Sequence, residues 1–363
     1  MKDCSRRKTT SVAVGSLRIG GDFPIAIQSM TNTDTHDADA TYRQICRLAE
    51  AGCDIVRLAV PDVGAAQTFR VLKARGVSLP LVADIHFDYR IALAAIEAGA
   101  DKIRINPGNI GSEEKVRAVV SACEERGVPI RIGVNSGSLE RDLLAAYGAP
   151  TAEALVASAL RHIRILEEMN FHRIVVSVKA SDVPTMLAAN RLLAQKTAYP
   201  LHLGVTEAGA RMRAVLKSGI GIGALLASGI GDTIRVSLTD DPVEEVAAAR
   251  EILSILDLTD RRGLDIVSCP TCGRTGIDLI SLVSQFERRI REERLQDLNV
   301  KVALMGCVVN GPGEAREADI GIAGGDGVGL LFRKGETICK LPEGELLDAL
   351  IGELKKMRAD GKV

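Results

Sequence analysis

The sequence predicts a TIM-type (β/α)₈ barrel followed by a small α+β domain. Between residues 25 and 240, eight short runs rich in β-branched residues alternate with longer segments of helical periodicity. Eight βα units in about 210 residues match the length of a closed barrel. A polar segment then precedes roughly 100 residues that mix helical and strand patterns, as expected of a second, smaller core.

The barrel region opens with a predicted hairpin at residues 10–24, where Gly15 and the Gly20-Gly21 pair indicate turns. Helical patterns such as 42–51, 90–98 and 113–126 follow the predicted strands. The eight strands are expected at residues 25–29, 54–60, 81–85, 101–106, 129–134, 173–179, 201–205 and 233–238.

The small domain is expected to begin after the polar linker 258–263. Its pattern predicts strands near 264–268, 300–305 and 319–323, and helices near 276–294 and 344–358. The chain therefore divides into a barrel with its hairpin (1–257), the linker (258–263) and the small domain (264–363).

Composition limits the classes of function. With 46% hydrophobic and 26% charged residues, the chain has the make-up of a globular protein, and its net charge of −1 favours neither nucleic acid nor membranes as partners. Aromatic residues amount to only 3%, without Trp, so a base-stacking surface is not expected. Residues 1–8 are charged and carry no apolar stretch, and no run is long and apolar enough to span a bilayer. The expected location is the cytoplasm.

Five predicted strands carry a cation between aliphatic residues. Alternate side chains of a strand point to opposite faces, so aliphatic residues that face the helices turn the cation into the barrel. Internal carboxylates such as Asp84 and Glu207 are one explanation for buried cations. Cations on five separate strands favour an anionic ligand, and arginine forks match phosphate groups. These residues are Arg57, Arg104, Arg131, Lys179 and Arg235.

Further polar side chains occur at the carboxyl ends of the predicted strands, the face on which TIM barrels build their active sites. Asn109 also fits a plain turn, and His86 also fits a satisfied polar core residue. The polar residues at these ends are Gln28, Ser29, Asp84, His86, Asn106, Asn109, Asn135, Glu207 and Ser237.

Three cysteines of the small domain stand among Gly, Pro and Asn residues. Cys269 and Cys272 form a Cys-x-x-C motif, and Cys307 follows 35 positions later. Three thiolates with a non-thiolate fit a [4Fe–4S] cluster, with Glu314 or Cys339 as the fourth ligand. Structural zinc and an unmetallated dithiol remain alternatives. The scattered Cys4, Cys46, Cys53 and Cys123 are expected to be mostly inert core thiols.

Both domains carry motifs of one known family. Cys-Pro-Thr-Cys at 269–272 and Gly-Cys-Val-Val-Asn-Gly-Pro-Gly-Glu at 306–314 resemble the GcpE (IspG) family, the 4-hydroxy-3-methylbut-2-enyl diphosphate synthases. The barrel motifs are similar too, and the resemblance runs from about residue 10 to 340 in the short two-domain bacterial form. The barrel motifs that resemble those of the family lie at residues 28–33, 83–90, 104–111, 177–181, 206–209 and 235–237.

The resemblance implies a reaction of the non-mevalonate isoprenoid pathway. The substrate would be 2-C-methyl-D-erythritol 2,4-cyclodiphosphate, opened and reductively dehydrated by two electrons to (E)-4-hydroxy-3-methylbut-2-enyl diphosphate. Flavodoxin or ferredoxin would supply the electrons. The resemblance also implies a homodimer in which the cluster domain of one chain closes over the barrel of the other.

The same resemblance assigns roles to residues. Cys269, Cys272 and Cys307 would hold a [4Fe–4S] cluster, with its fourth iron on Glu314 and Asn310 placed to hydrogen-bond near it. Asp84, Glu207 and His86 become candidates for proton delivery or hydroxyl binding. The diphosphate would be held by Arg57, Arg104, Arg131, Asn135, Lys179, Arg235 and Ser237.

Two rival interpretations stay open at this point. One is a non-redox barrel enzyme acting on a phosphorylated or pterin-like substrate, with a structural zinc in the small domain. The other is a redox-regulated binding protein whose Cys-x-x-C motif acts only as a switch.

Overall fold

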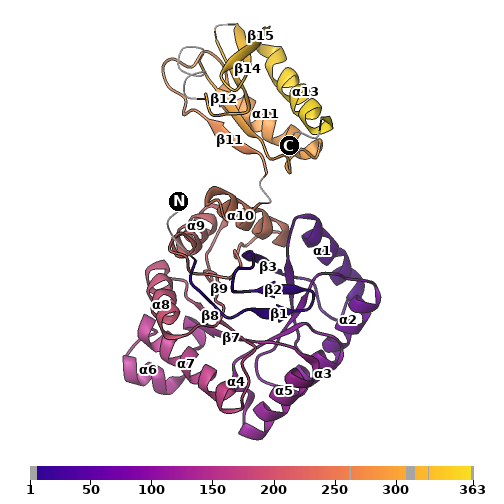
Figure 1. Ribbon diagram of the computed structural model, residues 1–363, viewed down its shortest axis with the longest axis vertical. Helices are drawn as coiled ribbons and strands as arrows, with labels where there is room; N and C mark the ends of the chain where they lie inside the picture. Colours follow the sequence, from indigo (N-terminus) through magenta and orange to yellow (C-terminus); the bar gives the residue numbers. More distant parts are fainter. Residues whose placement is uncertain (1–5, 261–262, 308–314, 326, 361–363) are drawn as a thin grey trace. The chain divides into compact units, whose positions relative to one another are not determined.

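The computed structural model describes residues 6–260, 263–307, 315–325 and 327–360 (Figure 1). The chain divides between Thr259 and Asp260 into two compact units. Within the described residues, no helix is both long enough and apolar enough to cross a membrane.

The first unit is the predicted (β/α)₈ barrel. Its eight strands pair in parallel in the order β8-β7-β6-β5-β4-β3-β10-β9. A parallel bridge between Val176 and Leu201 joins β8 to the segment before β9 and closes the ring. The strands are β3 (Ala26–Met30), β4 (Ile55–Ala59), β5 (Leu81–Asp84), β6 (Lys102–Ile105), β7 (Ile130–Asn135), β8 (Ile174–Lys179), β9 (His202–Leu203) and β10 (Thr233–Ile234).

A ring of helices surrounds the strands in Figure 1. Aspartate side chains cap the start of several of them by accepting backbone N–H bonds, as Asp62 does for α2 and Asp182 for α8. The helical segments are α1 (Ala38–Glu50), α2 (Val63–Ala74), α3 (Tyr89–Glu97), α4 (Pro107–Ile110), α5 (Glu113–Arg126), the 3₁₀ turn Ser136–Ser138, α6 (Arg141–Tyr147), α7 (Ala152–Glu168), α8 (Val183–Lys196), α9 (Arg211–Ala227) and α10 (Pro242–Ile255).

The predicted hairpin ahead of the barrel is confirmed as β1 (Val12–Val14) and β2 (Leu17–Ile19), paired antiparallel around Gly15. Its buried side chains form one apolar cluster with residues at the amino ends of four barrel strands: Ala26, Ile55, Val82 and Val175. In Figure 1 the hairpin lies across the ring of strands. It therefore seals the amino end of the barrel, which leaves the carboxyl end for the site.

Strand parity divides the barrel core into two layers. Aliphatic residues such as Val56, Leu58, Ile103 and Ile105 belong to the large core that the strands share with the helices. The side chains between them point the other way, into the barrel. Above the apolar layer at the hairpin, this interior is polar and charged.

The second unit is a five-stranded sheet in the order β11-β12-β13-β14-β15. Pairing is parallel from β11 to β13 and antiparallel from there to β15. One face of the sheet packs against both helices, as Leu304, Phe286 and Leu350 illustrate. The elements are β11 (Asp265–Ser268), α11 (Leu279–Glu292), β12 (Lys301–Met305), β13 (Ile320–Ala323), β14 (Val328–Arg333), β15 (Glu336–Pro342), the 3₁₀ turn Glu343–Glu345 and α13 (Leu346–Ala359).

The hairpin β14–β15 was not predicted from the sequence. Its turn is Lys334-Gly335, where both residues have positive φ (48° and 81°). Two residues of this conformation match the right-handed twist of the strands that they join. The signal was a Lys-Gly pair between two short runs rich in strand-forming residues.

Candidate active site

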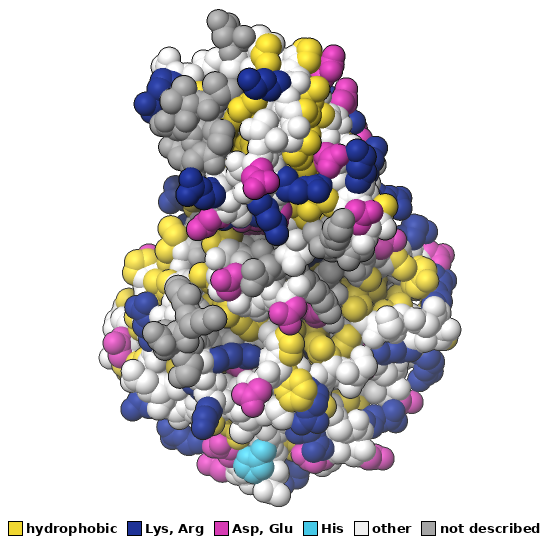
Figure 2. All heavy atoms as spheres, turned by 45° about the horizontal axis from the view of Figure 1, so that its top comes forward, with side chains coloured by type: hydrophobic (Ala, Val, Ile, Leu, Met, Phe, Trp, Pro, Cys, Tyr) yellow, Lys and Arg dark blue, Asp and Glu magenta, His cyan; other side chains and the backbone are white. Residues whose placement is uncertain are grey.

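The carboxyl end of the barrel collects the inward cations that strand parity predicted. Arg57, Arg104 and Arg131 lie within β4, β6 and β7, Lys179 ends β8, and Arg235 directly follows β10. Besides burial, the four arginines all act on Lys179 and help to lower its pKa. On the described part of the face in Figure 2, by contrast, basic and acidic side chains are interspersed. The concentration of positive charge is a feature of the interior.

Asp84 is the carboxylate at the centre of this group. It lies 3.6 Å from Nε of Arg57 and 3.4 Å from Nη1 of Arg104. Burial alone would raise the pKa of Asp84, but Arg57, Arg104 and Arg131 outweigh it and hold that pKa below its usual value. Asp84 is therefore an ionised acceptor.

Two of the five cations, Arg131 and Lys179, form no ion pair with any described residue, although Arg131 is only 1% exposed. Nε and Nη1 of Arg131 also lack a hydrogen-bond partner there. Unpaired buried donors of this kind are costly unless a ligand or water satisfies them. They are the observation that points most directly to an anion.

Two basic side chains that were not predicted from the sequence, Lys102 and His202, lie below this layer. Lys102 shares the inward parity of Arg104 and is fully buried, and His202 on β9 accepts or donates a hydrogen bond with Thr233 at 2.8 Å. Burial and the neighbouring cations lower the pKa of both groups well below its usual value. Lys102 lies two residues before Arg104 on the same strand, so the alternation of side chains that turns Arg104 into the barrel also turns Lys102 inward. This alternation was the sequence signal for Lys102.

A third missed residue is Glu245 of α10. It is buried, pairs with Arg235 at 3.1 Å and accepts a hydrogen bond from Ser29 at 2.8 Å. The described barrel interior thus sets six Lys and Arg side chains against the two carboxylates Asp84 and Glu245. The six are Arg57, Lys102, Arg104, Arg131, Lys179 and Arg235.

Inward glycines make room for the cations. A Cβ atom on Gly133 would lie 2.4 Å from Nε of Arg104, and one on Gly204 would lie 2.9 Å from Nζ of Lys179. Such distances are far below van der Waals contact, so the side chains could not stay where they are. Each glycine is the inward residue beside a cation on a neighbouring strand.

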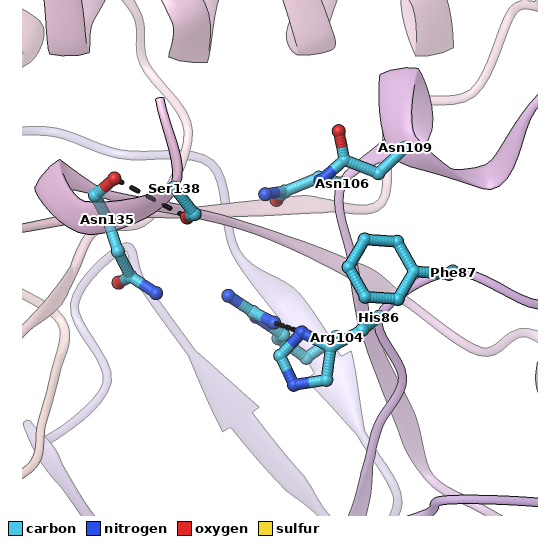
Figure 3. A pocket seen from close by; sticks show the side chains of 7 residues that line it. All are labelled: His86, Phe87, Arg104, Asn106, Asn109, Asn135 and Ser138. Carbon is cyan, nitrogen blue, oxygen red and sulfur yellow. Dashed lines mark hydrogen bonds between the residues drawn. The ribbon is translucent and has the colours of Figure 1, made fainter. Parts of the chain in front are cut away.

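A pocket of about 390 Å³ opens beside Arg104 (Figure 3). In this view the Arg104 guanidinium meets the imidazole of His86, and the two groups approach to 3.2 Å. Asn106 holds the wall together, because its Oδ1 accepts the backbone N–H of Gly133 at 2.9 Å. The lining residues are His86, Phe87, Arg104, Asn106, Asn109, Asn135 and Ser138. Phe87 and Ser138 were not foreseen from sequence.

Glu207 and Ser237 occupy the loops after β9 and β10. Ser237 is half-buried, two residues beyond Arg235. Glu207 is exposed and has a φ of +50°, a conformation that costs free energy for a residue other than glycine. Glu207 is not the internal counter-ion that the sequence suggested, and no ion pair joins it to a described residue.

The cysteine motif of the second unit lies at the carboxyl ends of two adjacent parallel strands. Cys269 follows β11, Cys307 follows β12 by two residues, and the backbone N–H of Gly306 points to Sγ of Cys269 at 3.3 Å. Between them, Cys272 forms a turn in which its N–H donates to Oγ1 of Thr275 at 3.0 Å. A Cβ on Gly306 would lie 2.7 Å from Thr275, so glycine is required for the two loops to meet.

Thiols on neighbouring loops, with a backbone N–H on one sulfur, are a donor set that fits an iron–sulfur cluster. Within the described ranges, no three His, Cys, Asp or Glu side chains are gathered closely enough to hold a metal ion. Asn310 and Glu314 lie outside the described residues. Cys339 lies on β15, at the far edge of the sheet from β11.

The thiols of the barrel are of a different kind. Burial raises the pKa of Cys53 and of Cys123 to about 12, so both stay protonated. Cys46 is half-buried, and Cys4 lies outside the described residues.

Comparison with known proteins gives matches over both units. Residues 9–250 match the GcpE TIM-barrel domain, and residues 265–356 match the GcpE protein C-terminal domain. A curated protein of Clostridium perfringens is 60% identical over 347 residues, which cover 96% of this chain and 98% of that protein. Relatives from Geobacter sulfurreducens (57%; 98% and 99% covered) and Clostridium tetani (55%; 97% and 99%) are similar. All three are named 4-hydroxy-3-methylbut-2-en-1-yl diphosphate synthase (flavodoxin).

Proposed function

The chain belongs to the GcpE family, and from this premise we propose that it converts 2-C-methyl-D-erythritol 2,4-cyclodiphosphate to (E)-4-hydroxy-3-methylbut-2-enyl diphosphate. The observation that carries the proposal is the excess of buried cations at the carboxyl end of the barrel. A cyclic diphosphate supplies negative charge to Arg131 and Lys179, and it supplies acceptor oxygens to the unpaired Nε and Nη1 of Arg131.

Arginine and lysine side chains from five strands fix the diphosphate. Arg131 and Lys179 contact it from β7 and β8, and Arg57, Arg104 and Arg235 approach it from the other strands. Asn135, the last residue of β7, and Ser237, in the loop after β10, add neutral donors. The cations already hold their positions before the substrate binds, so binding requires little rearrangement of the protein.

The reaction consumes two electrons and two protons per substrate and releases one water. A leaving hydroxyl needs a proton donor. Asp84 is held ionised by three arginines, so we assign it to binding a substrate hydroxyl. His86 and Glu207 remain the candidate donors, His86 at the pocket wall and Glu207 in the strained loop after β9.

The members of this family are iron–sulfur enzymes, and we propose that Cys269, Cys272 and Cys307 hold a [4Fe–4S] cluster with Glu314 on the fourth iron. When bound, such a cluster supplies electrons one at a time and offers a Lewis-acidic iron to a substrate oxygen. Gly306 donates a backbone N–H to the Cys269 sulfur, a hydrogen bond of the kind that tunes cluster sulfurs. We place Asn310 near this site as a hydrogen-bonding group.

Flavodoxin is the proposed electron donor, because the relatives carry it in their names, and ferredoxin is the alternative. We propose a homodimer in which the small domain of one chain closes over the barrel of the other. The proposed location is the cytoplasm, where the free thiols of the chain stay reduced. A non-redox enzyme with a structural zinc is not favoured, since both units match one redox family.

Turnover by the anaerobically purified protein tests the proposal. With reduced methyl viologen as donor, the cyclodiphosphate should disappear as the allylic diphosphate and water form, and iron should be near four per chain. A colourless protein with one zinc per chain and no product would refute both the function and the cluster.

A further inference from the structure

We infer that Glu245 is a positioning residue that aims Arg235 at the bound diphosphate and fixes the loop that carries Ser237. The inference rests on the proposed function of the site and adds a residue from the helix layer to it. Glu245 lies in the first turns of α10 and is 4% exposed.

The two carboxylate oxygens of Glu245 hold one edge of the Arg235 guanidinium. Nη2 of Arg235 donates to Oε1 at 3.1 Å, and Nε donates to Oε2 at 3.3 Å. Two parallel hydrogen bonds fix the plane of the guanidinium as well as its position. Among the described residues, Nη1 of Arg235 has no hydrogen bond, so this corner of the fork is left for a ligand.

The same carboxylate accepts two further hydrogen bonds. Oγ of Ser29 on β3 donates to Oε2 at 2.8 Å, and the backbone N–H of Leu238 donates to Oε1 at 3.2 Å. Glu245 thus binds the chain at residues 235 and 238, on both sides of Ser237. A shift of α10 or of this loop would move both proposed diphosphate contacts together.

Charge neutralisation alone does not explain this arrangement. Arg131 is more deeply buried than Arg235 and yet has no carboxylate partner in the described part of the chain. Asp84 is shared between two arginines at 3.4 and 3.6 Å. Glu245 instead takes part in four hydrogen bonds of defined direction, one from β3 and three from the loop after β10, which is what orientation requires.

The test compares Glu245→Gln with Glu244→Gln in the anaerobic holoenzyme. Glu244 is the preceding residue of the same helix, but it is only half-buried and pairs with the exposed Arg211 at 2.8 Å. Glutamine keeps the shape of the side chain and loses its charge and one acceptor. Binding of the cyclodiphosphate, measured by calorimetry, should weaken roughly 10- to 100-fold in Glu245→Gln. It should change less than about twofold in Glu244→Gln.

The kinetic signature of positioning is a KM that rises more than kcat falls, with iron content and visible spectrum unchanged. If Glu245→Gln does not fold, Ser29→Ala removes one of the four hydrogen bonds and should raise KM a few-fold. An unchanged KM in every folded variant would overturn the inference.

A double-mutant cycle decides whether Glu245 acts through Arg235. In an Arg235→Ala background, Glu245→Gln should cost no further affinity and should recover part of it, because it removes a buried, unpaired carboxylate beside the diphosphate. A further loss as large as in the wild type would show a role independent of Arg235. Failure of the wild-type protein to bind the cyclodiphosphate would refute the proposed function itself, an outcome distinct from equal binding by wild type and Glu245→Gln.

Discussion

The single residue Arg131 illustrates how a group that lowers the stability of the free protein can favour ligand binding. Its guanidinium is buried, surrounded by other cations and without an ion-pair partner in the described residues. Such a group destabilises the free protein and gains its counter-ion when an anion binds. Strand parity was sufficient to find it, because a cation between Ile130 and Ile132 can point only into the barrel.

Replacing Arg131 with methionine should therefore separate affinity from stability. We expect cyclodiphosphate affinity to fall on the order of 100-fold, because a charge-assisted contact is lost. The free energy of unfolding should stay equal or rise by about 1 kcal/mol, because an uncompensated buried charge is removed. Calorimetry and urea denaturation measure the two effects. Arg117→Met, at an exposed ion pair on α5, is the control, and a destabilised Arg131→Met protein with normal affinity would contradict the account.

Lys179 makes substrate binding dependent on pH. Burial, together with Arg57, Arg131 and Arg235, lowers the pKa of Lys179 well below its usual value. A bound diphosphate raises that pKa again, so between the free and bound pKa values binding takes up a proton and affinity falls as pH rises. Because the pKa of Lys179 is lower in the folded protein, the unfolded chain binds more protons at pH values between the folded and unfolded pKa. In this range the contribution of Lys179 to the free energy of unfolding increases with pH.

Calorimetric titration in two buffers of different ionisation enthalpy measures the uptake. The wild type should take up protons on binding the cyclodiphosphate. Lys179→Arg, whose guanidinium stays charged, should take up fewer. Identical proton uptake in the two proteins would assign the effect to another group, such as Lys102.

Glu314 and Cys307 should differ in what they do for the proposed cluster. A carboxylate is a more exchangeable iron ligand than a thiolate, so Glu314→Ala should retain more iron than Cys307→Ser while its turnover is impaired. Iron analysis and visible absorption after anaerobic purification measure this. Complete loss of iron in both variants would make Glu314 as necessary for assembly as a cysteine.

At the scale of elements, the strands and their parity could be predicted because a period of two is visible in single runs such as Ile103-Arg104-Ile105. The expected strands 201–205 and 233–238 proved shorter, at two residues each. Glu245 could not be found in this way. It comes from the first turns of a helix, where an acidic residue is ordinary, and only the fold brings it to Arg235. The ligand role of the cysteines likewise needed the family resemblance, because spacing left zinc open.

The close packing of Arg104 on β6 against Gly133 on β7 predicts that one added methyl group at residue 133 impairs substrate binding. In Gly133→Ala, the new Cβ would meet Arg104 and displace its guanidinium from Asp84 and His86. We expect KM for the cyclodiphosphate to rise roughly tenfold in a protein that still folds. Gly137→Ala is the matched control, since nothing lies within 4 Å of the atom it adds. Equal KM values for the two variants would show that Arg104 does not need its present position.

At the scale of the whole molecule, two units with separate cores carry the two halves of the proposed chemistry. The barrel, closed at its amino end by the β1–β2 hairpin, presents the cations. The smaller unit brings Cys269 and the Cys307 loop together at the edge of a parallel strand pair. Binding and reduction can therefore be impaired separately. Barrel variants should keep their iron, and cysteine variants should keep a folded barrel.

The most direct measurement is the number of electrons consumed per molecule of product. Because a [4Fe–4S] cluster passes one electron at a time, the anaerobic protein is mixed with the cyclodiphosphate and a measured amount of reduced methyl viologen. The electrons that the viologen loses are then counted against the allylic diphosphate formed. We expect two electrons per product in the wild type, and iron-replete but unreactive protein in Arg131→Met at low substrate concentration. Product formed without loss of electrons, or viologen that the cyclodiphosphate never reoxidises at any concentration in the presence of the protein, would contradict the proposed reaction.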